Sequence, residues 1–309
     1  MNDEPVCIVC RQSECAVEAT LVSEVDQKNY QAVKCKNCGL VFTFPIPNLT
    51  ANSLQDIYDD EYVEGQRHIG VDNEAIKVLR EATHRQMEIV EQYIHAGTAL
   101  NVGAMNGAVK VLEDRGWKLE IVEVSEHAAR TARELWGFNV SISRIEDYDC
   151  PPEKFDFIKL GHVIEHLADP RFALEKMCQM LRLGGIILID TDNADGLKTK
   201  LEVNTRKVFG ESSTTTLVKK LTGKNLRKRY GRLTPPEHLY CFNEKSLTTL
   251  LQSVGFKILK VVKTSWGDST WFPLVNERFS PTEKGLMALD TIGARFGMGE
   301  VMAVLAIKN

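Results

Sequence analysis

Four cysteines near the start of the chain stand in two pairs whose spacing suits a metal ion. Cys7 and Cys10 form one CxxC pair, Cys35 and Cys38 form the other, and 24 residues lie between the pairs. Each pair is a tight knuckle that can direct two sulfur atoms at one ion, so the two pairs give a tetrahedral four-cysteine zinc site. Protein fills all four positions of such a site, and we therefore expect a structural zinc.

A second chemical pattern runs from the apolar stretch Ala99–Val102 to Glu123. Gly103 ends the first stretch, Gly107 opens an amphipathic stretch, and Glu123 comes at the end of the next apolar run. This pattern predicts a strand, a glycine turn, a helix and a second strand that ends in an acidic residue, which together form a nucleotide pocket. The acidic residue accepts hydrogen bonds from a ribose diol. The GxxxG spacing lacks the GxGxxG of dinucleotide-binding proteins.

Residues 162–166 read His-Val-Ile-Glu-His and are the densest group of titratable side chains outside the cysteines. The pattern HxxEH occurs in one class of metalloproteases, but there it lies on a helix, and here it follows a predicted strand. We expect His166 to act as a general base tuned by Glu165, because an unperturbed histidine has a pKa of about 6.5. A purely structural role, in which Glu165 and His166 cap and brace the segment, is the alternative.

The elements that would position these residues alternate between strand and helix after residue 96. Strands are expected at residues 99–102, 119–124, 139–142, 155–160, 186–190, 257–262 and 301–307, and helices at residues 108–115, 126–135, 171–181, 245–254 and 281–296. This order predicts an α/β, Rossmann-like fold with a mostly parallel seven-stranded sheet and helices on both faces. Ligands of such sheets bind at the carboxyl ends of the strands.

The pattern divides the chain into three parts. We expect a zinc ribbon at residues 1–47, a helical linker or lid at 48–95 with helices at 54–62 and 72–95, and a catalytic domain at 96–309. The ribbon is too small to bury a sufficient core of its own, so metal binding would supply its folding energy. A basic insertion is expected at residues 194–236, since residues 198–232 hold eleven Lys and Arg against two acids.

The length, composition and charge of the chain limit the class of protein to which it can belong. The chain has 309 residues, 43% hydrophobic residues and a net charge of −4, which does not demand a polyanionic partner. No apolar run approaches 18 residues, so no membrane span is expected. The acidic N-terminus lacks a signal peptide's features, and we expect a cytoplasmic protein in a reducing compartment.

The order of features from residue 99 onward resembles the class I S-adenosylmethionine-dependent methyltransferases. Residues 100–107 resemble that family's first motif, residues 155–162 its fourth strand, and residues 181–185 the turn before its fifth strand. Two CxxC pairs and the Pro-rich link at residues 44–47 are also similar to a bacterial subgroup that modifies sugars or other small metabolites. The resemblance covers about 200 residues.

The resemblance implies which residues bind S-adenosylmethionine and which face the substrate. The implied cofactor-binding residues are Asn101, Gly103, Ala104, Gly107, Glu123, Val124, Glu146 and Gly161. Beside the transferred methyl group, the implied catalytic residues are His162, Glu165, His166 and Tyr62. Some relatives hold a divalent ion at this place, so the resemblance also implies, as an alternative, a metal site of His162, Glu165 and His166. The chain departs from the family at two positions: Asn101 replaces the usual acid, and Met105 replaces the middle glycine.

These features predict methyl transfer to a small-molecule acceptor, with an anionic nucleotide-linked sugar or glycan precursor favoured and His166 as base. The basic insertion would contact the phosphate, although a solvated helical excursion is an equal alternative. Two other functions remain open: an RNA methyltransferase, which the acidic overall charge disfavours, and a non-catalytic, zinc-stabilised interaction protein.

Overall fold

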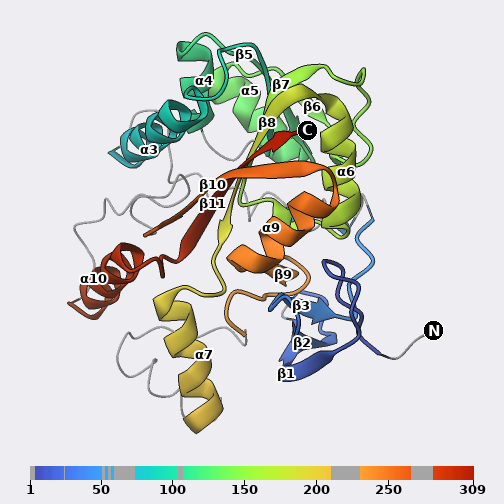
Figure 1. Cartoon of the computed structure of the whole chain (residues 1–309), viewed down its shortest axis with the longest axis vertical. Helices are drawn as coiled ribbons and strands as arrows, with labels where there is room; N and C mark the ends of the chain where they lie inside the picture. The colour runs from blue at the N-terminus through green and yellow to red at the C-terminus, as the bar shows by residue number, and fades with distance from the viewer. Residues whose placement is uncertain are drawn as a thin grey trace.

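Two sheets organise the chain (Figure 1). The computed structural model describes residues 4–23, 25–50, 53–54, 57–58, 74–103, 107–209, 230–265 and 281–309. Within these residues, the larger sheet has seven strands in the order β10-β11-β8-β7-β4-β5-β6, and the smaller has four strands in the order β1-β2-β3-β9.

The large sheet is parallel over five strands and antiparallel at one edge. Strands β6, β5, β4, β7 and β8 pair in parallel, whereas β11 pairs antiparallel with both β8 and β10. This arrangement confirms the predicted fold class. The strands are β4 (Thr98–Val102), β5 (Lys118–Glu123), β6 (Val140–Ile142), β7 (Phe155–Gly161), β8 (Leu181–Asp192), β10 (Phe256–Thr264) and β11 (Val301–Lys308).

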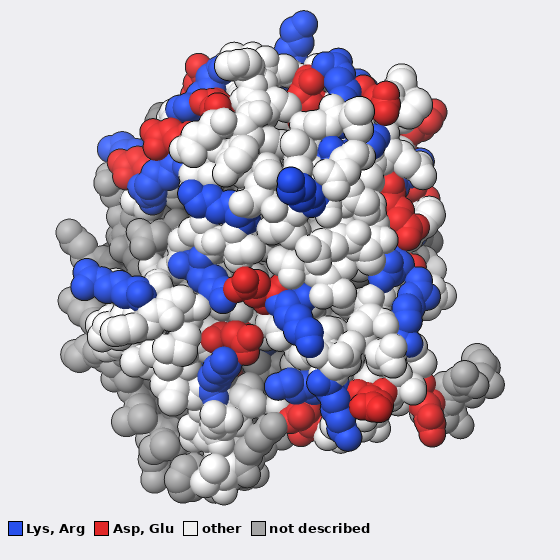
Figure 2. Space-filling model, viewed as in Figure 1, with Lys and Arg blue, Asp and Glu red and all other residues white. Residues whose placement is uncertain are grey.

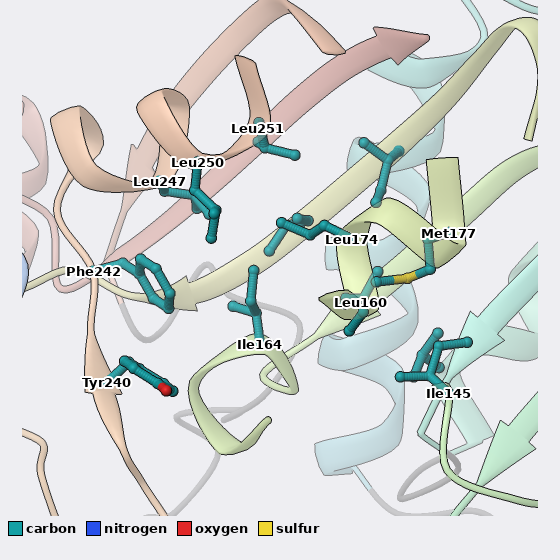
Figure 3. Close-up of a cluster of buried hydrophobic side chains, with 14 of the residues drawn as sticks. Ile145, Leu160, Ile164, Leu174, Met177, Tyr240, Phe242, Leu247, Leu250 and Leu251 are labelled. Carbon is teal, nitrogen blue, oxygen red and sulfur yellow. The ribbon is translucent and has the colours of Figure 1, made fainter. Parts of the chain in front are cut away.

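Helices cover both faces of this sheet, and each strand divides its side chains between them. On β8, Ile186 and Leu188 belong to one buried cluster, and the alternate residues Ile187 and Ile189 belong to another. The first cluster includes residues of α3 (Glu74–Val90), α4 (Lys110–Asp114) and α5 (Glu126–Trp136), and the second, seen in Figure 3, includes residues of α6 (Pro170–Met180) and α9 (Glu244–Ser253). Burial on both faces explains the nearly continuous apolar sequence of the central strands.

The N-terminal ribbon is joined to the catalytic half by a strand from far along the chain. Its strands β1 (Cys15–Val22), β2 (Asn29–Cys35) and β3 (Val41–Phe44) form an antiparallel sheet. The fourth strand is β9 (Tyr240–Cys241), which pairs with Val41 and Phe42 of β3. Arg171 of α6 also donates hydrogen bonds to the carbonyl oxygens of Ile8 and Val9.

Several predicted boundaries differ from those in the structure. Strand β8 begins at Leu181, so the expected turn at residues 181–185 is part of the strand, and α3 ends at Val90 rather than at residue 95. The helix expected at residues 108–115 is divided into a 3₁₀ turn, η1 (Gly107–Val109), and the short helix α4. Most of the helix expected at residues 54–62 lies outside the described residues.

Two further helices, α7 (Leu197–Phe209) and α10 (Pro281–Arg295), contact each other, and α10 also contacts β10. A 3₁₀ turn, η2 (Ile164–His166), follows β7. Much of the basic insertion, residues 210–229, lies outside the described residues. On the face in Figure 2, Lys and Arg side chains are interspersed with Asp and Glu. Among the described residues, no helix is long and apolar enough to cross a membrane.

Candidate functional site

A cavity lies across the carboxyl ends of the parallel strands, and we call it the strand-tip cavity. It brings together eight of the residues expected to form the site, from four strands and the segments that follow them. These residues are Asn101, Gly103, Glu123, Val124, Glu146, Gly161, His162 and His166. Two other expected residues, Tyr62 and Ala104, lie outside the described residues, as does Met105.

The two glycines of the first motif have different structural roles. Gly103 has a φ angle of +92°, which favours glycine, and its N–H donates to the carbonyl of Val122 at 2.8 Å. Gly107 is buried but does not line the cavity; a Cβ there would stand 2.5 Å from Nε1 of Trp136. Gly103 therefore shapes the turn at the strand tip, and Gly107 allows η1 to pack closely against α5.

The carboxylate of Glu123 is held in the cavity wall by the first turn of α5. It is 6% exposed, and its Oε1 accepts a hydrogen bond from the N–H of Ser125 at 2.8 Å. Ser125 is also the N-cap of α5, because its side chain accepts from the N–H of Ala128. The same Ser125 hydroxyl donates to the carbonyl of Tyr58 at 3.0 Å.

The rest of this end of the cavity fits the adenosine part of S-adenosylmethionine. Glu146 lies beside Glu123 in the lining and pairs with Arg144 at 3.3 Å. Val124 and Ile145 add apolar surface for a purine ring. A nucleoside requires a carboxylate that accepts hydrogen bonds from the ribose hydroxyls and apolar side chains that pack against the purine ring, and this end of the cavity provides both.

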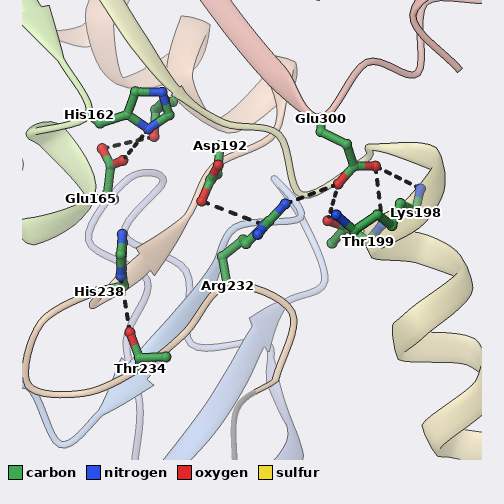
Figure 4. Close-up of polar contacts among 10 residues, drawn as sticks. His162, Glu165, Asp192, Lys198, Thr199, Arg232, Thr234, His238 and Glu300 are labelled. Atoms are coloured by element: carbon green, nitrogen blue, oxygen red, sulfur yellow. Dashed lines mark hydrogen bonds and ion pairs between the residues drawn. The ribbon is translucent and has the colours of Figure 1, made fainter. Parts of the chain in front are cut away.

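At the end of β7, His162 has a φ angle of +52°, an uncommon conformation for a residue other than glycine. Its backbone N–H donates to the carbonyl of Asp190, and its Nδ1 lies 3.1 Å from Oε1 of Glu165 (Figure 4). The second oxygen of Glu165 accepts from the hydroxyl of Thr191 at 3.0 Å. Burial, the largest influence, lowers the pKa of His162, but the hydrogen bond and charge of Glu165 outweigh it and raise the pKa overall.

His166 lies among three groups from distant parts of the chain. Its Nδ1 is 3.0 Å from the hydroxyl of Tyr58 and 3.1 Å from the carbonyl oxygen of Glu237, and its ring centroid is 4.3 Å from that of His238. A carbonyl oxygen only accepts hydrogen bonds, so Nδ1 carries the proton and Nε2 is the basic nitrogen. Burial, together with the neighbouring His238, lowers the pKa of His166 to about 3. The side chain is therefore neutral at pH 7.

The ligand atoms of Glu165, His166 and His238 lie within 4.8 Å of one another. A divalent-ion site of His162, Glu165 and His166 is one alternative to the general base, but His162 is not part of the group that the structure brings together. His238 comes from the segment between the basic insertion and β9, and its Nδ1 lies 3.0 Å from the hydroxyl of Thr234. The tertiary structure thus replaces one histidine of the expected set by another.

The four cysteines of the ribbon come together as their spacing predicts. Sγ of Cys7 is 3.5 Å from Sγ of Cys38, Sγ of Cys10 is 3.4 Å from Sγ of Cys35, and all four sulfur atoms lie within 4.8 Å of one another. Sulfur atoms around a tetrahedral zinc are about 3.8 Å apart, given Zn–S bonds of about 2.3 Å, so the four thiols fit this ion. The hydrogen bond between Cys7 and Cys38 lowers the pKa of the Cys7 thiol and raises the pKa of the Cys38 thiol, so the two groups share one proton and binding of zinc would release it.

Sequence reasoning missed a polar group beneath the same cavity. Lys159 of β7 is 5% exposed and donates to Oδ2 of Asp190 at 2.7 Å and to Oε1 of Gln86 at 3.0 Å. Gln86 of α3 donates in turn to Oδ1 of Asp190 at 2.8 Å. The available signal was a lysine and an aspartate inside apolar strands, since such residues are almost never fully buried unless paired.

A model of a protein family, described as a methyltransferase domain, matches residues 74–261. The chain belongs to this methyltransferase family. The match begins at α3 and ends within β10, so it includes every described residue of the strand-tip cavity except those contributed by residues 49–58. The predicted membership of the class I methyltransferases is thereby confirmed.

One relative by sequence and two solved structures are also similar to this methyltransferase, and the structures share its fold. An uncharacterized protein of Methanocaldococcus jannaschii is 27% identical over 117 residues, which cover 38% of this chain and only 55% of that protein. An S-adenosylmethionine-dependent methyltransferase of Thermotoga maritima has a TM-score of 0.51 and 17% identity, with 83% of this chain and 100% of that chain covered. The 1,6-didemethyltoxoflavin-N1-methyltransferase of Burkholderia thailandensis, solved with 1,6-didemethyltoxoflavin and S-adenosylhomocysteine, has a TM-score of 0.51 and 13% identity over 92% of this chain and 96% of that chain.

Proposed function

We propose that this methyltransferase moves the methyl group of S-adenosylmethionine to a small-molecule acceptor, with His166 as the general base. The observation that carries the proposal is the content of one cavity, whose lining includes both the Glu123 carboxylate and the imidazole of His166. The first is suited to a ribose diol, and the second to a proton on the acceptor. The cofactor supplies the methyl group and the leaving group; the protein supplies position and a base.

The residues around His166 have separable tasks in this proposal. The carbonyl of Glu237 and the phenol of Tyr58 hold Nδ1 at 3.1 and 3.0 Å, which fixes the ring and leaves Nε2 to accept the acceptor's proton. Holding two reactants in a near-attack geometry is worth about 7–11 kcal/mol of the barrier, and a general base adds about 10²–10⁴-fold. Because burial lowers the pKa of His166 to about 3, the base is unprotonated at pH 7 but weak. It therefore suits an acceptor whose proton is acidic or is lost as the methyl group arrives.

As acceptor we favour a nucleotide-linked sugar or a glycan precursor. The support is the run of eleven basic residues over positions 198–232, which would meet the phosphates of such a substrate. Within the described part of this run, Lys200 pairs with Asp195, and Arg232 pairs with Asp192 and Glu300; residues 210–229 of the run lie outside the described residues. For the ribbon we propose a structural zinc held by Cys7, Cys10, Cys35 and Cys38.

Two experiments test the proposal in order. Titration calorimetry of the zinc-loaded protein with S-adenosylmethionine and S-adenosylhomocysteine should give micromolar binding, and absence of binding to folded protein would favour a non-catalytic interaction protein. Methyl transfer from tritiated S-adenosylmethionine is then measured with nucleotide sugars and with total RNA as acceptors. Label in the sugar fraction is the expected result, whereas label in RNA alone would overturn the proposed substrate class.

A further inference from the structure

We infer that Lys159 binds the carboxylate at the amino-acid end of S-adenosylmethionine, and that Asp190 and Gln86 hold it in position. This inference rests on the proposed function, because it assigns a residue to one end of the proposed cofactor. Below, Lys159, Asp190 and Gln86 together are called the lysine cluster.

The order of the strands fixes the direction in which the cofactor lies. Glu123 ends β5 and Glu146 follows β6, so the ribose and adenine sites lie toward the β6 edge of the sheet. Strands β4, β7 and β8 follow in that order on the other side of β5. A ligand whose adenosine lies near β5 and β6 therefore extends its amino-acid end over β4 and β7.

The lysine cluster lies under that end of the cavity. Lys159 pairs in register with Asn101 of β4, and both side chains line the cavity together with Thr83 of α3. The ammonium group of Lys159 is 3.7 Å from the position that a Cβ on Gly161 would occupy. A side chain at residue 161 would stand beside the ammonium group at the cavity wall. Because residue 161 is glycine, a ligand in the cavity can approach the ammonium group there.

The hydrogen bonds of Lys159 leave it able to bind an anion. Its ammonium group has three N–H donors, of which two point to Asp190 and Gln86. Gln86 and Lys159 occupy both oxygens of the Asp190 carboxylate, so the cluster is rigid before a ligand arrives. A carboxylate accepting the third N–H would form a charge-assisted hydrogen bond, which is stronger than a neutral one.

The lysine cluster also accounts for the unusual residue in the first motif. Asn101 carries no charge, and its Nδ2 donates to the carbonyl of Gly103 at 2.5 Å. Because residue 101 pairs in register with Lys159, an acid there would place a second carboxylate near the single ammonium group of Lys159. With asparagine at position 101, the positive charge of Lys159 faces only the negative charge of Asp190. The lysine then keeps its affinity for the anionic group of the ligand.

The test compares S-adenosylmethionine with decarboxylated S-adenosylmethionine, which differs only by the loss of that carboxylate. The protein variant is Lys159→Met combined with Asp190→Asn, because Lys159→Met alone would leave a buried unpaired carboxylate. Wild-type protein should bind the complete cofactor roughly 10- to 100-fold more tightly than the decarboxylated one. In the double variant this preference should fall to near unity through weaker binding of the complete cofactor, with affinity for the decarboxylated compound retained.

Controls separate this inference from the proposed function. Lys154→Met removes a lysine that pairs with Glu120 and does not line the cavity, so it should keep the full preference. Circular dichroism and thermal unfolding establish that the double variant is folded; if it is not, the preference is measured in Lys159→Gln, which keeps a polar partner for Asp190. A preference that survives in the variant, or that is absent from the wild type, overturns the inference alone. If neither compound binds wild-type protein, both the inference on Lys159 and the proposed function are wrong.

Discussion

The hydroxyl of Tyr58 lies 3.0 Å from Nδ1 of His166, although the two residues are 108 positions apart in the sequence. The carbonyl oxygen of Tyr58 also accepts a hydrogen bond from the hydroxyl of Ser125. Ser125 caps α5, and its backbone N–H donates to the carboxylate of Glu123. One short segment before the catalytic domain thus contacts both the proposed base and the support of the proposed ribose site. The sequence pointed to a tyrosine of this segment, but the expected catalytic residue, Tyr62, lies outside the described residues.

Replacing His166 should reduce turnover without weakening cofactor binding. We expect His166→Asn to lower kcat by about 10²-fold, the low end of the usual contribution of a general base, because its lowered pKa makes His166 a weak base. The affinity for S-adenosylhomocysteine, measured by calorimetry, should stay within a factor of about two. His95→Asn, at an exposed histidine, is the matched control and should keep wild-type turnover. Full activity of His166→Asn would remove the proposed base.

Tyr58→Phe tests whether the phenol positions that base. The substitution keeps the ring and removes the hydroxyl that contacts Nδ1, so we expect a smaller loss of kcat, of roughly 10-fold, the value of one hydrogen bond. Turnover should fall further in His166→Asn, and the double variant should be no worse than His166→Asn alone. Additive losses would indicate that Tyr58 acts separately from His166.

Glu123→Gln should weaken cofactor binding. The substitution keeps the shape of the side chain but removes the charge that accepts from the ribose hydroxyls, and we expect a loss of roughly 10- to 100-fold in affinity. Calorimetry with S-adenosylhomocysteine measures it. Glu134→Gln, on the exposed side of α5, serves as the control. Unchanged affinity in Glu123→Gln would contradict the placement of the ribose site.

The lowered pKa of His166 predicts a loss of stability in acid. Burial first, and then His238, hold its folded pKa at about 3, whereas the unfolded chain titrates near about 6.5. As the pH falls through this window the unfolded state gains a proton that the folded state lacks, which costs up to about 1.4 kcal/mol per pH unit. His162 has a raised pKa, and its contribution is fully present below about 6.5, so it does not produce this loss. Urea unfolding between pH 7 and pH 5 should show a shallower decline for His166→Asn than for wild type; parallel declines would contradict the assignment.

Removal of one zinc ligand should unfold the ribbon and disturb its junction with the catalytic half. Cys38→Ser is expected to lower the zinc content, measured by elemental analysis, from one ion per chain toward zero. Because β9 pairs with β3 and Arg171 holds Ile8 and Val9, hydrogen exchange should also rise in β9 and at the start of α6. Cys15→Ser leaves the four ligands intact and should retain the zinc. Full zinc content in Cys38→Ser would exclude the four-cysteine site.

Spacing along the sequence was sufficient for the features that depend on local pattern. The alternation of apolar strands and amphipathic helices predicted the seven-stranded sheet, because a strand buried on both faces and a helix buried on one have different periodicities. The two CxxC pairs predicted four sulfur atoms at one point, since each knuckle fixes two of them. The placement of Glu123 at a strand tip followed from the same logic.

Only the tertiary structure decided which distant residues share the site. His238 and Tyr58 reach His166, and Lys159 meets Asp190 and Gln86, through the packing of elements that the sequence leaves far apart. Residue type predicts what a side chain can do, and local periodicity predicts which face of an element it occupies. The partner across a cavity depends on strand order and helix position, and these are set by burial summed over the whole chain. For this reason the base, its neighbours and the lysine cluster became visible as groups only in the folded protein.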